Sequence, residues 1–223
     1  MSVALAARLR AGTSAMHAEA ERTPFMAALM GGQLDRRSYC LLLRNLEPVY
    51  EELERALLRH AGHEQVAPVV MQALFRTQSL RLDLQALHGS GWALDLPVLP
   101  ACTRYTERLK ELARSRPTLL VAHAYVRYLG DLSGGQMLQR VVARGLRLVP
   151  DGTGMAFLDF GVPHDVARLA GTLRASLDEV ARAGADVEAL VAEATWSFEL
   201  HCILFAELAE AGGLPTGGAT LPR

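Results

Sequence analysis

The residues best suited to chemistry lie in one stretch, residues 125–136, with the sequence YVRYLGDLSGGQ. Apolar residues at helical spacing continue on both sides, so the pattern predicts one long helix from Pro117 to Leu148. Three glycines fall within six residues near its middle, and each costs a helix about 1 kcal/mol relative to alanine. Glycine permits a kink and lets another group approach the backbone closely. This stretch is therefore the first candidate for a binding site.

One stripe of this helix combines missing side chains with two charges. At about 100° of rotation per residue, the stripe contains Arg127, Gly130, Asp131 and Gly134. Arg127 and Asp131 are one helical turn apart, which is the spacing of an ion pair. The opposite side is predicted to face the core and carries Tyr125, Leu129 and Leu132. The stripe fits either close helix packing with a surface ion pair or a site for a flat ligand.

His17 is the histidine whose neighbours best fit such a ligand. It lies at the edge of an apolar strip on the first predicted helix, where a histidine is usually a partly buried core residue. The strip consists of Leu5, Leu9, Met16 and Ala20. A planar macrocycle needs an axial ligand on one side and close backbone approach on the other. Arg10 lies about 10 Å from His17 along the helix axis, about the span from a porphyrin iron to its propionates, so it could pair with a carboxylate while His17 holds the metal. The sequence contains no zinc-ligand spacing, nucleophile motif or phosphate loop.

The elements that must position these residues are all predicted to be helices. Helical patterns separated by glycine, proline and capping residues cover residues 2–22, 24–30, 35–60, 79–88, 97–113, 117–148, 164–182 and 186–211. Ser2 is the expected cap of the first helix, and Pro48 is expected to bend the third. No alternating strand pattern or repeat is found, so residues 1–211 are predicted to form one all-α domain. The tail, residues 212–223, is rich in glycine and proline and is predicted to be disordered.

Composition limits the functional classes. The chain has 223 residues, of which 50% are hydrophobic and 21% charged, and its net charge is -1. These values suit one globular domain and give no general attraction to nucleic acid or to a membrane. Three scattered cysteines (Cys40, Cys102 and Cys202) fit reduced thiols. No apolar run reaches about 18 residues and no signal pattern opens the chain, so a soluble, cytoplasmic protein is expected.

The stretch from residue 125 to residue 136 resembles the signature of the heme oxygenase family. The lead-in TLLVAHA at 118–124 is also similar, as are residues 13–21, the region of Tyr50 and the final helix with Phe198 and Phe205. The resemblance covers most of the chain and implies an all-α fold in which heme lies between the first, proximal helix and a glycine-kinked distal helix. The activity it implies is O2- and reductant-dependent cleavage of heme b to biliverdin, carbon monoxide and ferrous iron.

The resemblance also implies a role for individual residues. His17 would be the proximal ligand of the heme iron, with Glu21 near its outer nitrogen. Gly130 and Gly134 would contact the distal face of the heme. Asp131 would organise distal water, supported by Arg127 and Tyr50. Two further residues, Tyr125 and Phe198, are expected to contact the heme.

Several positions depart from the better-known animal enzymes. The matching positions of their basic propionate clamp carry Arg10 and Ser14, and the later basic pair falls on Ala167 and Gly171. Arg168 and Arg174 are close by, so these two and Arg10 are the candidate propionate anchors. His201 stands where the family often has a polar amide. The C-terminal membrane anchor of the animal enzymes is absent, which favours a soluble bacterial enzyme.

Two functional classes remain open. The chain has no flavin or nicotinamide motif, so an enzyme would take electrons from a separate reductase, ferredoxin or flavodoxin. The alternative is a noncatalytic heme-binding or heme-sensing protein on the same fold. Arg127, Gly130, Asp131 and Gly134 favour the enzyme, because a protein that only binds heme has no need of a group that holds distal water. The biliverdin isomer and the biological purpose are not determined by the sequence.

Overall fold

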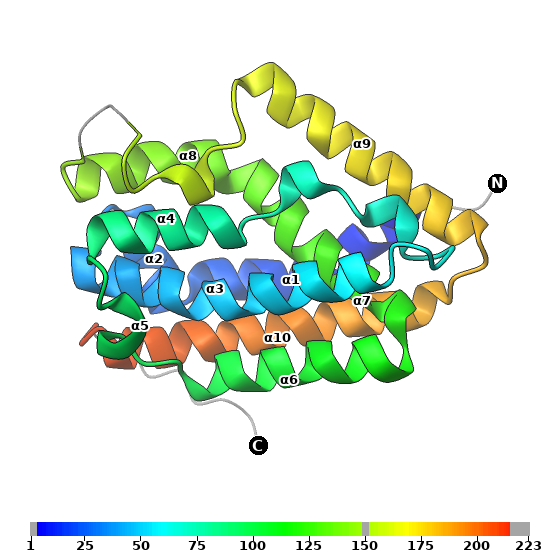
Figure 1. Ribbon diagram of the computed structural model, residues 1–223, viewed down its shortest axis with the longest axis horizontal. Coiled ribbons are helices and arrows are strands. Elements are labelled where there is room, and N and C mark those ends of the chain that lie inside the picture. Colours follow the sequence, from blue (N-terminus) through cyan, green and yellow to red (C-terminus); the bar gives the residue numbers. More distant parts are fainter. Residues whose placement is uncertain (1–3, 149–151, 215–223) are drawn as a thin grey trace.

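The computed structural model describes residues 4–148 and 152–214, and these ranges contain helices and no strands, as predicted (Figure 1). The helices are α1 (Leu5–Arg22), α2 (Pro24–Met30), α3 (Arg36–Arg59), α4 (Thr77–Leu87), α5 (Trp92–Asp95), α6 (Pro100–Ser115), α7 (Leu120–Ala124), α8 (Gly130–Gly145), α9 (Pro163–Arg182) and α10 (Val187–Ala211). A π-helical segment, η4 (Tyr125–Leu129), joins α7 to α8. Short 3-10 turns cover Ala67–Val69, Gln72–Leu74, Pro117–Leu119 and Ala156–Leu158.

Several helix starts follow from local sequence. The side chains of Thr23, Asp35 and Asp186 each accept a backbone N–H of the first turn that follows. The start of α1 differs from the prediction, because Ser2 lies outside the described residues and the helix begins at Leu5. The Leu5 N–H donates to the carboxylate of Asp178 on α9 at 3.0 Å, so a distant helix supplies the cap.

Other boundaries also shift for identifiable reasons. Helix α6 begins at Pro100 rather than at residue 97, with proline in the first turn where its missing N–H costs nothing. Helix α4 begins at Thr77 rather than Ser79, because Glu54 on α3 accepts the Thr77 N–H. The pattern gave no sign of α5 or of the 3-10 turns. The end of α10 is closed by Leu214, whose N–H donates to the Ala209 carbonyl, and residues 215–223 lie outside the described part.

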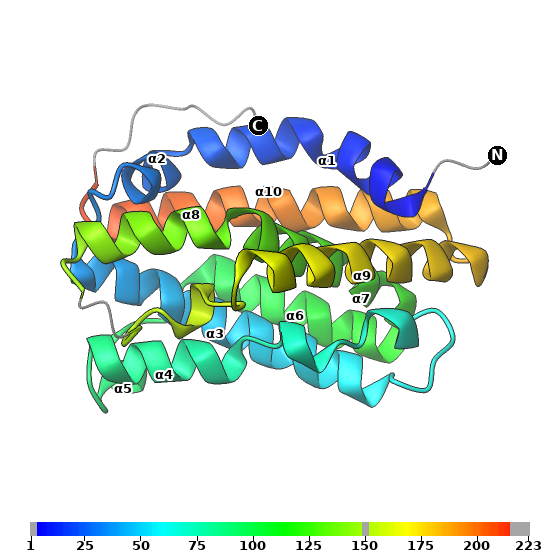
Figure 2. The ribbon, with the colours of Figure 1, turned by 90° about the horizontal axis from the view of Figure 1, so that it is seen from above.

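Helix α10 packs against α1, α2, α6 and α7, and it lies next to α6 in Figure 1 and next to α1 in Figure 2. With a mean hydropathy of 1.3, it is long and apolar enough by composition to span a membrane. Its packing against other helices accounts for part of that apolar character, since 39% of the apolar window is buried. Helix α10 is therefore the element that can carry side chains toward both α1 and α7.

The distal helix is not one regular α-helix, which corrects a sequence prediction. The π-helical turns of η4 change the rotation per residue, so regular winding misplaces side chains there. Val126 and Tyr128 are buried in the core, whereas Tyr125 and Leu129, predicted to be core, are only half-buried. Helical structure ends at Gly145 rather than Leu148. The irregular turn thus lies directly before the first glycine of the stripe.

Candidate active site

Of the three glycines in the first two turns of α8, two face open space. Among the residues that the structure describes, a Cβ added at Gly130 would meet no atom within 4 Å, and one at Gly134 would meet only the end of the Leu138 side chain at 4.0 Å. Gly135 differs, because its Cβ would lie 3.3 Å from the backbone oxygen of Leu158. Helix packing therefore explains Gly135 and not the other two. The open face fits a ligand that touches the backbone.

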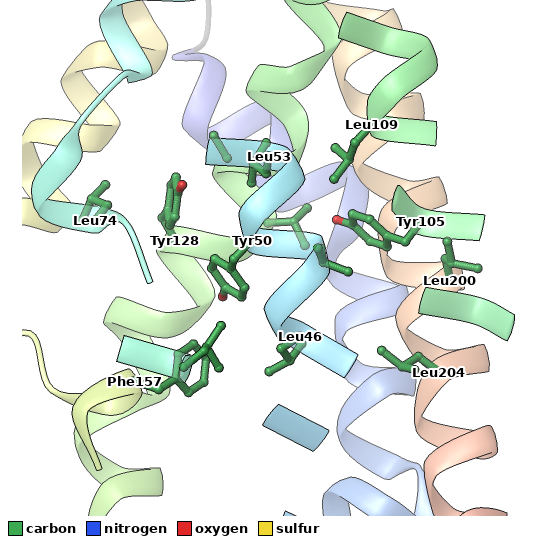
Figure 3. Packing of buried hydrophobic residues seen from close by; sticks show 14 of the residues in the cluster. Leu46, Tyr50, Leu53, Leu74, Tyr105, Leu109, Tyr128, Phe157, Leu200 and Leu204 are labelled. Atoms are coloured by element: carbon green, nitrogen blue, oxygen red, sulfur yellow. The ribbon is translucent and has the colours of Figure 1, made fainter. Parts of the chain in front are cut away.

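A buried polar group lies beside this face and joins α3 to the distal helix. The Tyr50 hydroxyl donates to the Asp131 carboxylate, and it accepts the Nε–H of Arg127 at 3.0 Å and an Nη2–H at 2.8 Å. Arg127 and Asp131 form the predicted ion pair, with Nη2 and Oδ1 3.5 Å apart. All three side chains are largely buried, so the pair is not the surface ion pair of the packing interpretation. Tyr50 comes from α3, where its ring lies against Tyr128 and Phe157 (Figure 3).

Burial gives the Asp131 carboxyl unusual acid–base properties. Removal from water raises the pKa of Asp131, while the Arg127 charge and the Tyr50 hydrogen bond act in the opposite direction. A carboxyl with a raised pKa holds its proton closer to neutral pH and can pass it on there. The geometry therefore suits Asp131 to proton transfer at the open face.

Two charged residues that were not predicted from the sequence, Arg76 and Asp83, bind backbone groups near Tyr50 and Asp131. The Arg76 guanidinium donates to three backbone carbonyls, those of Ala73, Phe75 and Asp159, and its charge favours ionised Asp131. Asp83 accepts the N–H groups of Ala156 and Phe157 at 2.8 Å each and so fixes the turn that contacts Tyr50. Their sequence signal is weak, because a single charge in a helical pattern normally marks a solvated face.

A second hydrogen-bonded network joins buried His123 to the partly exposed Arg108 through Glu193. His123 donates from Nε2 to Glu193 at 3.1 Å and accepts the Tyr105 hydroxyl at Nδ1 at 2.9 Å. Arg108 holds Glu193 with two hydrogen bonds of 3.0 and 2.6 Å. Although burial opposes ionisation, the bonds from His123 and Arg108 lower the pKa of Glu193 to about 2. His123 is fully buried in this network.

His17 lies on α1 with its side chain 53% exposed, so it is not the partly buried core residue that its type would suggest. The buried position beside it belongs to Thr13, whereas Met16, predicted to be core, is only half-buried. The imidazole packs edge-on against Phe198 of α10, with ring centroids 5.6 Å apart. Its Nδ1 lies 3.7 Å from a carboxylate oxygen of Glu21. An exposed imidazole with one nitrogen beside a carboxylate leaves the other free for a metal.

The basic residues proposed from the sequence are exposed and separate. Arg168 is 61% exposed and pairs with Asp165 at 3.5 Å. Arg10 and Arg174 are exposed and form no ion pair within the described part of the chain. Arg174 precedes Asp178 by one turn of α9, and Asp178 binds the first residue of α1. Arg174 therefore belongs to the part of α9 near the start of the helix that carries Arg10.

Comparison with known proteins gives consistent results. The family model described as heme oxygenase matches residues 3–207. A heme oxygenase of Pyropia yezoensis is 38% identical over 204 residues, which cover 92% of this chain and 85% of that protein. The solved structure of heme oxygenase-2 from Synechocystis sp. in complex with heme and NO has a TM-score of 0.88 and 34% identity, and covers 94% of this chain and 87% of that chain. The structure of heme oxygenase from Leptospira interrogans has a TM-score of 0.85 and 34% identity, and covers 92% of this chain and all of that chain, 100%. With the open glycine face, the buried Tyr50–Arg127–Asp131 group and matches over nearly its whole length, the chain belongs to the heme oxygenase family.

Proposed function

We propose that this protein is a heme oxygenase that cleaves heme b to biliverdin, carbon monoxide and ferrous iron, using O2 and electrons from an external donor. Cleavage of heme to biliverdin is the known reaction of the family. The observation that carries the proposal is the open face at Gly130 and Gly134 next to the buried carboxyl of Asp131. A flat substrate against this face would meet backbone on one side and a proton donor at its edge.

The residues available to hold heme come from α1, η4, α8 and α10. His17 of α1 is proposed to bind the iron, with its Nδ1 held toward Glu21. Gly130 and Gly134 are proposed to lie against the opposite face of the substrate. Tyr125, half-buried in η4, and Phe198, in contact with the His17 ring, are proposed to line the pocket.

The propionates need cations at the edge of the pocket. Arg10, Arg168 and Arg174 are the proposed anchors, because their guanidinium groups are exposed and can form charge-assisted hydrogen bonds with a carboxylate. Arg168 would exchange its exposed partner Asp165 for a propionate at little cost, since an exposed ion pair contributes about 0–1 kcal/mol.

The protein's contribution to the reaction centres on one proton. Bound heme supplies the iron at which O2 is activated and the carbon ring that is cleaved. Asp131 is proposed to hold and release the proton that the reaction consumes, through an ordered water. Tyr50 and Arg127 keep its carboxyl in one orientation by hydrogen bonds that are already formed in the free protein.

Electrons are proposed to come from a separate reductase, ferredoxin or flavodoxin, and the reaction to take place in the cytoplasm. A noncatalytic heme-binding protein is the second candidate. The buried Tyr50–Asp131 pair favours the enzyme, since burying a carboxyl without a chemical use only costs stability.

The proposal is tested by adding hemin to the purified protein, recording the Soret band, and then adding ascorbate or a ferredoxin system under air. Conversion of the Soret band to bilin absorbance is expected. A Soret band that persists under these conditions would support the heme-binding alternative. In the variant His17→Ala the spectrum should lose the features of a protein nitrogen ligand; an unchanged axial nitrogen would exclude His17 as the iron ligand.

A further inference from the structure

His201 of α10 is buried against the polar group of the distal helix and touches Arg127 directly. Its Nε2 lies 2.6 Å from Nη1 of Arg127, and the residue is only 4% exposed. Its Nδ1 lies 2.6 Å from the backbone carbonyl oxygen of Ser197, one turn earlier in the same helix. Both ring nitrogens are therefore occupied.

The partners determine which nitrogen carries the proton. A carbonyl oxygen can only accept, so Nδ1 must be the N–H donor to Ser197. A guanidinium can only donate, so Nε2 must be the unprotonated acceptor of the Arg127 Nη1–H. The imidazole is neutral in this arrangement. Burial and the Arg127 charge agree with this, because they lower the pKa of His201 to about 3.

The hydrogen bonds that Arg127 donates also determine where the hydrogen of the Tyr50 hydroxyl points. With Nη1 held by His201, the Nε–H and an Nη2–H of Arg127 both donate to the Tyr50 oxygen, at 3.0 and 2.8 Å. A hydroxyl oxygen has two lone pairs and one hydrogen. Since both lone pairs are used, the hydrogen can only go to the Asp131 carboxylate. An ionised Asp131 can only accept this bond, and because Arg127 uses both Tyr50 lone pairs, the direction stays the same when Asp131 carries a proton.

We propose that His201 is a positioning residue that orients Arg127 and thereby makes Tyr50 donate to Asp131. This inference rests on the proposed function, because it concerns the same site. Three aromatic rings hold the imidazole in place: Tyr105, Phe205 and Phe198 lie with ring centroids 5.2, 6.1 and 6.5 Å away. The Arg127 guanidinium cannot rotate about its own axis without losing the bond to His201.

An imidazole and a side-chain amide at this place can both accept from Arg127, but only the amide also brings a free donor group. An amide carries both an acceptor oxygen and a donor NH2 group at its end, and either can point toward Arg127 or toward water. His201 offers Arg127 only an acceptor, because the Ser197 carbonyl holds its one N–H. The site thus has no competing donor from α10, and Asp131 keeps the Tyr50 hydrogen.

The test compares His201→Leu, His201→Asn and the matched control Ser197→Ala. Leucine cannot accept a hydrogen bond, asparagine can through its oxygen, and Ser197→Ala removes a buried hydroxyl while keeping the carbonyl that binds His201. In heme-free, 15N-labelled protein, the Arg127 Nε–H signal should exchange slowly in the parent, in Ser197→Ala and in His201→Asn, and should be lost to fast exchange in His201→Leu. Equal protection in His201→Leu and the parent overturns the proposal.

Kinetics give the second readout. We expect His201→Leu to lower kcat for biliverdin formation about tenfold or more, with the Kd for hemin within about threefold of the parent, because misplacement of a catalytic group affects the chemical step. His201→Asn should recover most of kcat, and Ser197→Ala should match the parent. Loss of hemin affinity without loss of kcat would instead assign His201 to the pocket wall. The NMR comparison needs no heme, so it holds or fails separately from the proposed reaction.

Discussion

At the scale of single residues, the site is organised by which atoms can donate a hydrogen and which can only accept. Tyr50 has one hydrogen, and its two lone pairs are taken by Arg127, so that hydrogen goes to Asp131. Asp131 therefore has two fixed donors, the Tyr50 hydroxyl and the Arg127 guanidinium, and it directly follows the open Gly130 in the sequence. We expect such a carboxyl to exchange its proton on the side away from these donors.

Replacing Asp131 with asparagine tests this role. The amide has the same size and its oxygen can still accept from Tyr50, so heme binding should remain within about threefold of the parent. The amide cannot supply a proton, so the rate of biliverdin formation should fall by about a hundredfold. Single-turnover absorbance in the bilin region measures the rate, and a Soret titration measures binding. Biliverdin formation at the parental rate would show that the proton comes from elsewhere.

At the scale of elements, the π-helical segment η4 and the glycines after it leave one face of the distal helix uncovered at Gly130 and Gly134. Segment η4 turns Val126 and Tyr128 into the core and leaves Tyr125 and Leu129 half-buried, while the open face begins at Gly130. The three glycines of this region do different things. Gly135 permits contact with the Leu158 backbone, whereas no atom of residues 4–148 or 152–214 comes closer than 4.0 Å to a Cβ built at Gly130 or Gly134.

Alanine substitutions separate these two uses of glycine. In the heme-free protein, Gly130→Ala should raise the free energy of unfolding by up to about 1 kcal/mol, since its Cβ meets nothing and alanine favours the helix. The same methyl group should weaken hemin binding about tenfold, because it takes the space of the ligand. Urea unfolding and Soret titration measure the two effects.

Gly135→Ala is the matched control, because it adds the same methyl group to the same helix at a glycine that packs against protein. Its methyl group would press against the Leu158 oxygen at 3.3 Å, so the gain in stability should be smaller or absent and hemin binding unchanged. If Gly130→Ala bound hemin as tightly as the parent, the open face would not be the binding surface.

At the scale of the whole molecule, buried ionisable groups link the site to the stability of the fold. The lowered pKa of His201, about 3 against 6.5 when unfolded, means that the unfolded chain binds more protons between these two values. Stability from this residue is therefore complete above pH 6.5 and is lost as the pH falls toward 3, on the order of 5 kcal/mol in all. The lowered pKa of Glu193 also makes the fold less stable as the pH falls, between pH 4.5 and about 2.

Denaturant unfolding measured from pH 7 to pH 3.5 tests this linkage. The free energy of unfolding should fall less with acidification in His201→Asn than in the parent, because the variant lacks one group that takes up a proton on unfolding. The raised pKa values of Asp83 and Asp131 act in the opposite direction, and they do so in both proteins. His164→Asn is the control, since the His164 side chain is 86% exposed and should leave the slope unchanged. Parallel curves for the parent and His201→Asn would contradict the assignment of the slope to His201.

The sequence alone determined the helical fold, most helix boundaries and the stripe of Arg127, Gly130, Asp131 and Gly134, because these depend on periodicity and on neighbours within one or two turns. Only the tertiary structure decided that Tyr50 meets Asp131 across 81 residues, that His201 accepts from Arg127, and that His17 is exposed. It also decided that Gly135 packs while Gly130 and Gly134 do not. Contacts between distant segments depend on how whole helices pack and where one of them departs from regular winding, and no local pattern contains that information.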